Sequence, residues 1–316
     1  MSSQTRTATL LKLLLIVVVG CVLPVGAAAE QASQPASAAA GGLDVGRFHS
    51  CALLPSAGVR CWGYGADGSL GYGNRATIGD DETPAAAGPV ELGAGRTGVA
   101  LSAGDFHTCA LLDDGAVRCW GFGGDGRLGT ASNAAIGDDE TPASLSPVDI
   151  GGRAKAITAG GNHSCAILDD GNVRCWGFGL DGQLGYGNAD YIGDNEAPSV
   201  VAPVKLGAGR TARAITAGRL HTCALLDDQT VRCWGANGNG QLGYGTRESV
   251  GENETPDAVG PVKLGRPAIA LSAGGFHTCA LLDDGTVRCW GFGLDGRLGY
   301  NNNDNVGDDE SPGSAG

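Results

Sequence analysis

The chain has 316 residues, a formal net charge of −13 at pH 7, 56 glycines and only 5% aromatic residues. A chain this acidic is a poor ligand for DNA, RNA or anionic lipid, so nucleic acid is excluded as an expected partner. Helical heptads and long amphipathic helical patterns are absent, and glycine-rich turns separate short Val, Ile and Leu segments. This pattern predicts an all-β protein.

The first 29 residues have the features of a secretory signal peptide. Arg6 and Lys12 precede an apolar run, and three alanines at 27–29 offer small side chains for cleavage. The run is too short and wrongly flanked for a stable membrane span. We therefore predict a signal peptide at 1–29 and a flexible leader, rich in Ala, Ser and Gln, at 30–42.

Cys21 offers an alternative to simple secretion. It follows Val-Val-Gly, which resembles a bacterial lipoprotein cleavage site whose cysteine carries the lipid. The expected location is secreted or periplasmic, and lipid anchoring at the cell envelope through Cys21 is the alternative. A membrane is an expected partner only in that second case.

Residues 43–316 contain five copies of one pattern: His-x-Cys, nine residues, then Cys-Trp-Gly. Successive copies begin 56 or 58 residues apart, which suits one propeller blade per repeat. The copies use every His, every Trp and all but one Cys of the chain. Residue types used once per repeat serve the repeat unit, so we expect a modular scaffold and no enzyme. The copies are His49/Cys51/Cys61/Trp62, His107/Cys109/Cys119/Trp120, His163/Cys165/Cys175/Trp176, His221/Cys223/Cys233/Trp234 and His277/Cys279/Cys289/Trp290.

Each repeat predicts four short strands, as in one blade of a propeller. In one copy they are 147–150, which begins Pro-Val, then 156–160, 164–168 and 173–176. The expected fold class is an all-β β-propeller of five four-stranded blades of about 57 residues. Ring closure stays open: a five-bladed ring, an open arc that pairs with another chain, and part of a larger propeller are all compatible with the five copies.

The spacing of the cysteines predicts one disulfide per repeat. Asp-Asp-Gly between the last two strands suits a three-residue hairpin loop whose Gly is left-handed. That register sets Cys109 opposite Cys119 at a non-hydrogen-bonded site, where side chains are closest. An oxidising compartment then favours the disulfide. The predicted bridges are Cys51–Cys61, Cys109–Cys119, Cys165–Cys175, Cys223–Cys233 and Cys279–Cys289.

Two hairpin loops depart from this pattern. Gln229 replaces the loop Gly of the fourth copy, at a cost of about 1 kcal/mol if the left-handed geometry is kept. The first copy has its Gly shifted by one place, at Gly58, and we expect a different turn there.

The remaining repeated residues have a structural and a chemical interpretation each. A zinc site of His107, Cys109 and Cys119 is conceivable, but structural zinc takes four ligands and each repeat supplies three. The His is therefore expected to pack and hydrogen-bond. Each Trp is expected to pack between blades with the stem of the nearby Arg, and a ligand-binding aromatic ring is the alternative.

Acidic loops recur once per repeat and are weak calcium candidates. The EF-hand spacing is absent, so a solvated turn is the expectation, with no resident metal or cofactor. The candidate ligands are Asp80, Asp81, Glu82, Asp138, Asp139 and Glu140.

The repeat resembles that of a known family. Residues 103–129 read Ala-Gly-x-x-His-Thr-Cys-Ala-Leu-Leu-Asp-Asp-Gly-x-Val-x-Cys-Trp-Gly-x-Gly-x-x-Gly-x-Leu-Gly, similar to the regulator of chromosome condensation repeat, and the resemblance covers 43–316. It implies a β-propeller, most often seven-bladed, and the Cys pair and signal peptide are similar to the secreted bacterial branch. The founding member exchanges guanine nucleotide on a nuclear small GTPase, which we do not expect of an exported chain. A secreted relative inhibits β-lactamases through its propeller face.

We therefore expect a secreted or cell-surface, non-catalytic scaffold that binds a protein partner not identified by the sequence. A calcium-dependent structural or adhesive module and an inhibitor of an extracellular hydrolase are the alternatives; a lytic or transferase enzyme ranks below both. Open blade edges would also favour self-association. The loops expected to contact a partner break the repeat most: 75–78, 130–136, 189–192, 246–250 and 301–306.

Overall fold

The computed structural model describes residues 42–54 and 58–315. All of these residues belong to one compact unit, 35–316. The expected signal peptide and Cys21 lie outside the described residues, as does the centre of the first hairpin loop. Among the helices that are described, none has the length and apolar character needed to span a membrane.

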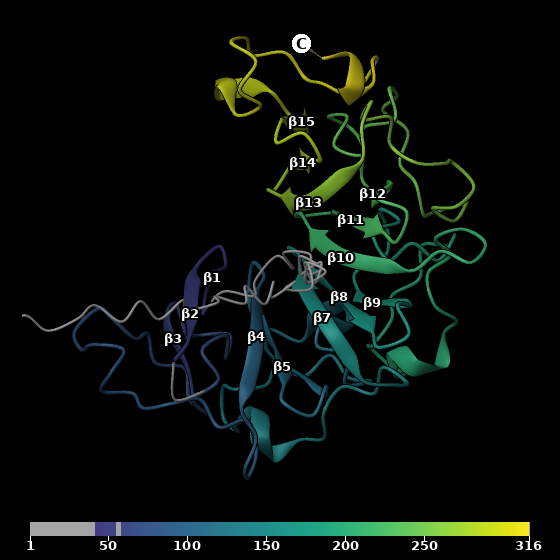
Figure 1. Cartoon of the computed structure of the whole chain (residues 1–316). Coiled ribbons are helices and arrows are strands. Elements are labelled where there is room, and N and C mark those ends of the chain that lie inside the picture. Colours follow the sequence, from purple (N-terminus) through teal and green to yellow (C-terminus); the bar gives the residue numbers. More distant parts are fainter. Residues whose placement is uncertain (1–41, 55–57, 316) are drawn as a thin grey trace, which may run out of the picture. The chain divides into compact units, whose positions relative to one another are not determined.

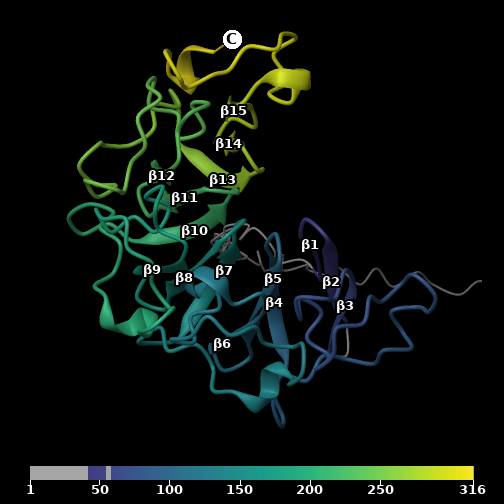
Figure 2. The same cartoon turned by 180° about the vertical axis from the view of Figure 1, so that it is seen from behind.

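The described chain forms five antiparallel sheets of three strands, and the strand order within each sheet follows the chain. Figure 1 and Figure 2 show the sheets succeeding one another in chain order. The strands are β1 Leu43–Val45, β2 His49–Leu53, β3 Val59–Gly63, β4 Gly98–Ala103, β5 His107–Leu112, β6 Val117–Gly121, β7 Ala154–Ala159, β8 His163–Leu168, β9 Val173–Gly177, β10 Ala212–Ala217, β11 His221–Leu226, β12 Val231–Gly235, β13 Ala268–Ala273, β14 His277–Leu282 and β15 Val287–Gly291.

Short 3-10 helices lie in the segments that follow the hairpins. Three of them begin at a proline, which fits the first helical position because it needs no N–H there. The helices are η1 Gly124–Gly126, η2 Pro142–Ser144, η3 Pro198–Val200, η4 Leu294–Gly296 and η5 Pro312–Ser314.

The sheets have three strands where the sequence predicted four. The strand that begins Pro-Val was expected to belong with the hairpin that follows it, but it lies beside the third strand of the preceding sheet and makes a single backbone bond there: Val90 N donates to Val59 O at 2.7 Å. Pro89 has no N–H to extend the ladder. The same single bond is made by Val148 to Val117, Val204 to Val173, and Val262 to Val231.

The hairpin register is the one that the cysteine spacing predicted. Cys109 lies opposite Cys119 with a Cα–Cα distance of 4.1 Å, and Gly115 closes the loop with a φ of 81°. All five hairpins carry the disulfide that was predicted for them: Cys51–Cys61, Cys109–Cys119, Cys165–Cys175, Cys223–Cys233 and Cys279–Cys289.

Gln229 keeps the left-handed geometry of the glycine it replaces, with a φ of 65°. Replacing Gln229 by glycine is therefore expected to raise the free energy of unfolding by about 1 kcal/mol, because glycine adopts this conformation without strain. Urea denaturation of the two proteins measures the change. The reverse replacement, Gly285→Gln at the same position of the fifth hairpin, is the matched control and should destabilise by a similar amount.

The tryptophans pack between sheets, as expected. Trp120 covers Gly71 of the preceding sheet so closely that a Cβ on this glycine would lie 2.8 Å from the indole nitrogen. In the last four sheets, the Arg two residues before the Trp reaches main-chain carbonyls, as when Arg174 Nη1 donates to Pro198 O at 2.9 Å. Four indoles are fully buried: Trp120, Trp176, Trp234 and Trp290.

Candidate binding surface

The repeated histidine joins each sheet to the next. His107 Nε2 lies 2.9 Å from Ser164 Oγ, and that hydroxyl donates to Arg127 O at 3.0 Å. The corresponding contacts join His49 to Thr108 at 2.7 Å, His163 to Thr222 at 2.8 Å and His221 to Thr278 at 2.9 Å. These four histidines therefore have the packing and hydrogen-bonding role that was expected, and the zinc alternative is wrong because its cysteines are disulfide-bonded.

Burial makes these imidazoles weak bases. It lowers the pKa of His163 and of His221 to about 3, and the pKa of His49 to about 4. They are neutral at pH 7, and their side chains do not face solvent. Such groups hold sheets together and do not serve as general bases toward an external substrate.

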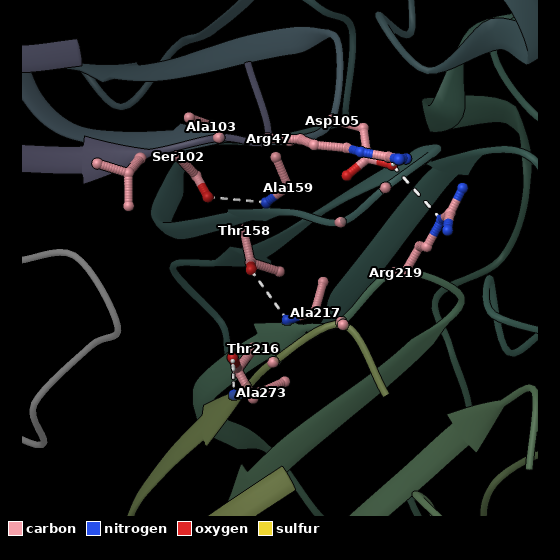
Figure 3. A pocket seen from close by; sticks show the side chains of 18 of the residues that line it. Arg47, Ser102, Ala103, Asp105, Thr158, Ala159, Thr216, Ala217, Arg219 and Ala273 are labelled. Carbon is pink, nitrogen blue, oxygen red and sulfur yellow. Dashed lines mark hydrogen bonds and ion pairs between the residues drawn. The ribbon is translucent and has the colours of Figure 1, made fainter. Parts of the chain in front are cut away.

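Residues from all five sheets line one cavity of about 580 Å³, here called the five-sheet cavity. Along its wall, the main-chain N–H at the end of one sheet's first strand donates to a hydroxyl of the preceding sheet (Figure 3). These bonds run from Ala159 N to Ser102 Oγ at 2.8 Å, from Ala217 N to Thr158 Oγ1 at 3.1 Å and from Ala273 N to Thr216 Oγ1 at 3.0 Å.

A charged cluster at the five-sheet cavity joins three sheets. Asp105 accepts an ion pair from Arg47 and another from Arg219, each at 3.5 Å. Figure 3 shows both guanidinium groups directed toward this carboxylate. Two cations share one anion, so the cluster is locally positive in an acidic chain. Their side chains are 46% and 43% exposed, which leaves them accessible to a carboxylate of another molecule.

All six phenylalanines of the chain occupy two positions of the repeat, directly before the His and directly after Cys-Trp-Gly. The two positions face each other across the hairpin, since Phe122 N donates to Phe106 O at 2.9 Å. The aromatic residues of one sheet therefore gather at one end of its hairpin. The first position holds Phe48, Phe106 and Phe276; the second holds Phe122, Phe178 and Phe292, with Tyr64 at the same place in the first sheet.

The aromatic and charged groups of the first two sheets are contiguous. The ring of Phe48 lies 5.0 Å from that of Phe106, 6.4 Å from that of Tyr64, and 5.0 Å from the Arg47 guanidinium. We call this the aromatic surface: Arg47, Phe48, Tyr64, Asp105 and Phe106, together with Phe122, whose main chain is bonded to that of Phe106. Sequence reasoning missed it, although the confinement of every Phe to two repeat positions was a signal that could have revealed it.

Three of the loops predicted to contact a partner, 130–136, 246–250 and 301–306, line hollows of the described chain. Residues 130–136 line an apolar hollow of about 520 Å³ with Leu145. Residues 246–250 line one of about 340 Å³ and 301–306 one of about 680 Å³. The hollow at 301–306 also contains Arg247 of the 246–250 loop, so these two loops share one hollow, whereas the hollow at 130–136 contains residues of no other predicted loop.

The acidic loops bring carboxylates together, within 4.8 Å of one another in each group. Burial, with help from Asp139, raises the pKa of Glu140 to about 7. Asp138 already pairs with Arg75 at 2.7 Å, which competes with any cation. The groups are Asp80/Asp81/Glu82, Asp138/Asp139/Glu140 and Asp308/Asp309/Glu310.

The chain is similar to a known family and to proteins of known sequence. The chain matches the profile of the RCC1-like domain over residues 23–314. The ultraviolet-B receptor UVR8 of Arabidopsis thaliana is 31% identical over 261 residues, which are 82% of this chain and 54% of UVR8. The mitochondrial RCC1 domain-containing protein RUG3 of the same plant is 31% identical over 265 residues, 82% of this chain and 55% of RUG3. The chain thus spans about half the length of these curated relatives.

Two solved structures share the fold. Human WBSCR16 superposes with a TM-score of 0.63 at 22% identity, covering 80% of this chain and 62% of WBSCR16. Yeast RCC1 (Prp20), solved bound to Kap60, superposes with a TM-score of 0.53 at 20% identity, covering 85% of this chain and 74% of the yeast RCC1 chain.

Proposed function

Since the chain belongs to the RCC1-like domain family and is a β-propeller protein with Cys-paired repeats, we propose that it is a non-catalytic scaffold that binds a protein through its aromatic surface. The proposal of no catalysis rests on four of the repeated histidines, which are buried, neutral and committed to contacts between sheets: His49, His107, His163 and His221.

The composition and exposure of the aromatic surface carry this proposal. Phe48 and Tyr64 are each 44% exposed and Phe122 is 42% exposed, although aromatic residues make up only 5% of this chain. Arg and aromatic residues are enriched at protein interfaces and dominate their energetics. Arg47, beside Asp105, offers a guanidinium to a partner carboxylate. A partner with an apolar side chain next to an acidic one fits this surface.

A related protein supports only the class of the proposed partner, which is a protein. Yeast RCC1, which shares the fold, was solved bound to a protein, Kap60. Inhibition of an extracellular hydrolase is one form that protein binding could take in this chain. We do not transfer guanine-nucleotide exchange, because an exported chain would not meet a nuclear GTPase.

We place the scaffold in a secreted or periplasmic setting. Five disulfides are typical of proteins that fold in an oxidising compartment. The proposed organisation is a signal peptide at 1–29, a leader at 30–42 and the propeller repeats at 43–316. Lipid anchoring at Cys21 is the alternative to free secretion.

Photo-crosslinking tests the aromatic surface. A benzophenone amino acid at Phe48 or Phe122 is expected to form a covalent adduct with a protein from the cell envelope or medium of the source organism. The same probe at Val200, which is 69% exposed on η3, is the control and should form none. Replacing Arg47 by Glu should lower the adduct yield about tenfold or more. Equal adducts at all three probe positions would contradict the proposal.

A calcium-dependent structural module is the second candidate, favoured only by the clustering of carboxylates in three acidic loops. Thermal melting separates the two functions. Calcium binding to the folded state would raise the melting temperature, and a chelator would reverse this. Crosslinking that persists in the chelator, with an unchanged melting temperature, eliminates the calcium function.

A further inference from the structure

The four internal contacts between sheets repeat one set of residues. Between the second and third sheets, His107 meets Ser164, and Trp176 covers Gly129, where a Cβ would lie 2.9 Å from the indole nitrogen. Each sheet therefore has two different faces. The trailing face carries the His and, in the loop beyond the hairpin, the covered Gly; the leading face carries the Ser or Thr and the Trp.

Strand register identifies the two faces at the ends of the series. In the first sheet, Leu43 and Val45 belong to the same face as Ser50 and Trp62, because residues paired across strands share a side and sides alternate along a strand. These four residues form the leading face of the first sheet.

The same alternation defines the trailing face of the fifth sheet. Ser272 pairs with Cys279 across the first two strands of this sheet. His277 and Leu281 lie two residues before and two residues after Cys279, and Val287 pairs with Leu281. The trailing face of the fifth sheet therefore comprises these five residues.

Within the described residues, no sheet covers the trailing face of the fifth sheet. Val287 is 54% exposed and Leu281 is 36% exposed. No atom lies within 4 Å of where a Cβ of Gly299 would be, although the equivalent Gly129 is covered by an indole. The valines equivalent to Val287 are 0% exposed in the other four sheets: Val59, Val117, Val173 and Val231.

The leading face of the first sheet is uncovered in the same way. Leu43 is 58% exposed, and Trp62 is half-buried although every other Trp is fully buried. The residues equivalent to Leu43 are covered by the preceding sheet: Leu101 is 0%, Ile157 3%, Ile215 2% and Leu271 6% exposed. In every internal contact, the trailing face of one sheet packs against the leading face of the next. The two uncovered faces are one trailing face and one leading face, so they are of the two kinds that pack together.

We propose that the trailing face of the fifth sheet binds the leading face of the first sheet of a second copy of this chain. The contact continues the internal series: the Ser50 hydroxyl meets His277, and Trp62 covers Gly299. Exposed apolar faces of this kind mark association sites. The two copies are related head to tail, because the surfaces that meet are different on each copy.

Analytical ultracentrifugation over a wide concentration range tests the contact. The wild-type chain is expected to form dimers or longer assemblies as concentration rises. Val287→Glu and Leu43→Glu should each weaken association about tenfold or more by placing a charge in an apolar interface. Both positions are exposed in the separate chain, so their folding is expected to be retained. Val200→Glu is the matched control and should associate like wild type.

A mixture of the two glutamate variants tests the head-to-tail arrangement itself. The Val287→Glu chain keeps its leading face and the Leu43→Glu chain keeps its trailing face, so the mixture should form one-to-one dimers that neither variant forms alone. The proposal is overturned if the wild-type chain stays monomeric at every concentration, which includes a chain that joins its own two faces. It is also overturned if the mixture of the two variants stays monomeric. Leu281→Lys and Val45→Lys test the same faces if a glutamate variant loses its β-sheet circular dichroism.

Discussion

Replacing both Cys165 and Cys175 by alanine is expected to lower the free energy of unfolding by about 2–5 kcal/mol. The bridge closes a short loop between residues ten apart, which restricts the unfolded chain, and both cysteines are fully buried in the folded sheet. Loss of the bridge therefore frees the unfolded chain and removes packed sulfur from the core. Equilibrium denaturation in urea, compared with the wild-type protein, measures this loss.

The fifth hairpin provides the control for this prediction. Cys279 and Cys289 are also ten residues apart, so their replacement by alanine relaxes the unfolded chain to the same extent. Cys279 is only half-buried, so the packing loss should be smaller. Equal stability of the third-hairpin variant and the wild type, or a larger loss at the fifth hairpin, would show that the bridges do not stabilise this fold as described.

Acidification is expected to destabilise the protein well before its acidic groups are all protonated. Burial lowers the pKa of His163 and His221 to about 3 and that of His49 to about 4, against 6.5 when unfolded. The unfolded state therefore binds protons first as the pH falls. The contribution of these neutral histidines to the free energy of unfolding is fully present above pH 6.5, and it is lost as the pH falls from about 6.5 to about 3. The loss is on the order of several kcal/mol for these histidines together.

Glu140 contributes with the opposite sign, because its raised pKa lets the folded state bind a proton near pH 7. It is one partly exposed group among several buried histidines, so we expect the histidines to dominate. Melting temperatures between pH 7.5 and pH 4.5, values chosen to span roughly the titration of the unfolded imidazole, measure the net slope.

His163→Gln should flatten this slope, because a glutamine amide can donate to Thr222 but does not titrate. His277→Gln is the control: this His is half-buried and has no following sheet in the described chain, so the slope should change little. An unchanged slope in the His163 variant would refute the histidine origin of the acid sensitivity.

The hairpins were predictable because local chemistry determines them. The Asp-Asp-Gly loop fixes the register of the hairpin, and the register sets Cys109 opposite Cys119. The left-handed conformation of Gln229 followed from the same comparison of copies. The buried Trp and the hydrogen-bonded His were predictable for a related reason, since each occurs once per repeat and serves the contact between repeats.

The fourth strand and the binding surface were less accessible to sequence reasoning. Pro89 and Val90 suit a strand, but a missing N–H and a single bond to Val59 leave only a bridge. The Asp105 cluster joins Arg47 to Arg219 across three repeats, and a contact of that kind depends on how the sheets are arranged. The aromatic surface had a sequence signal, because every Phe of the chain occupies one of two repeat positions, but which of these rings lie close together depends on the arrangement of the sheets.

We propose that this chain is an exported array of disulfide-closed repeats. Intact mass spectrometry of the exported protein, alkylated under denaturing conditions before and after reduction, tests it most directly. The account predicts a chain that begins at Glu30, takes up no alkyl groups before reduction and takes up ten afterwards. Alkylation of repeat cysteines without reduction, or a chain that retains residues 1–29, would contradict it.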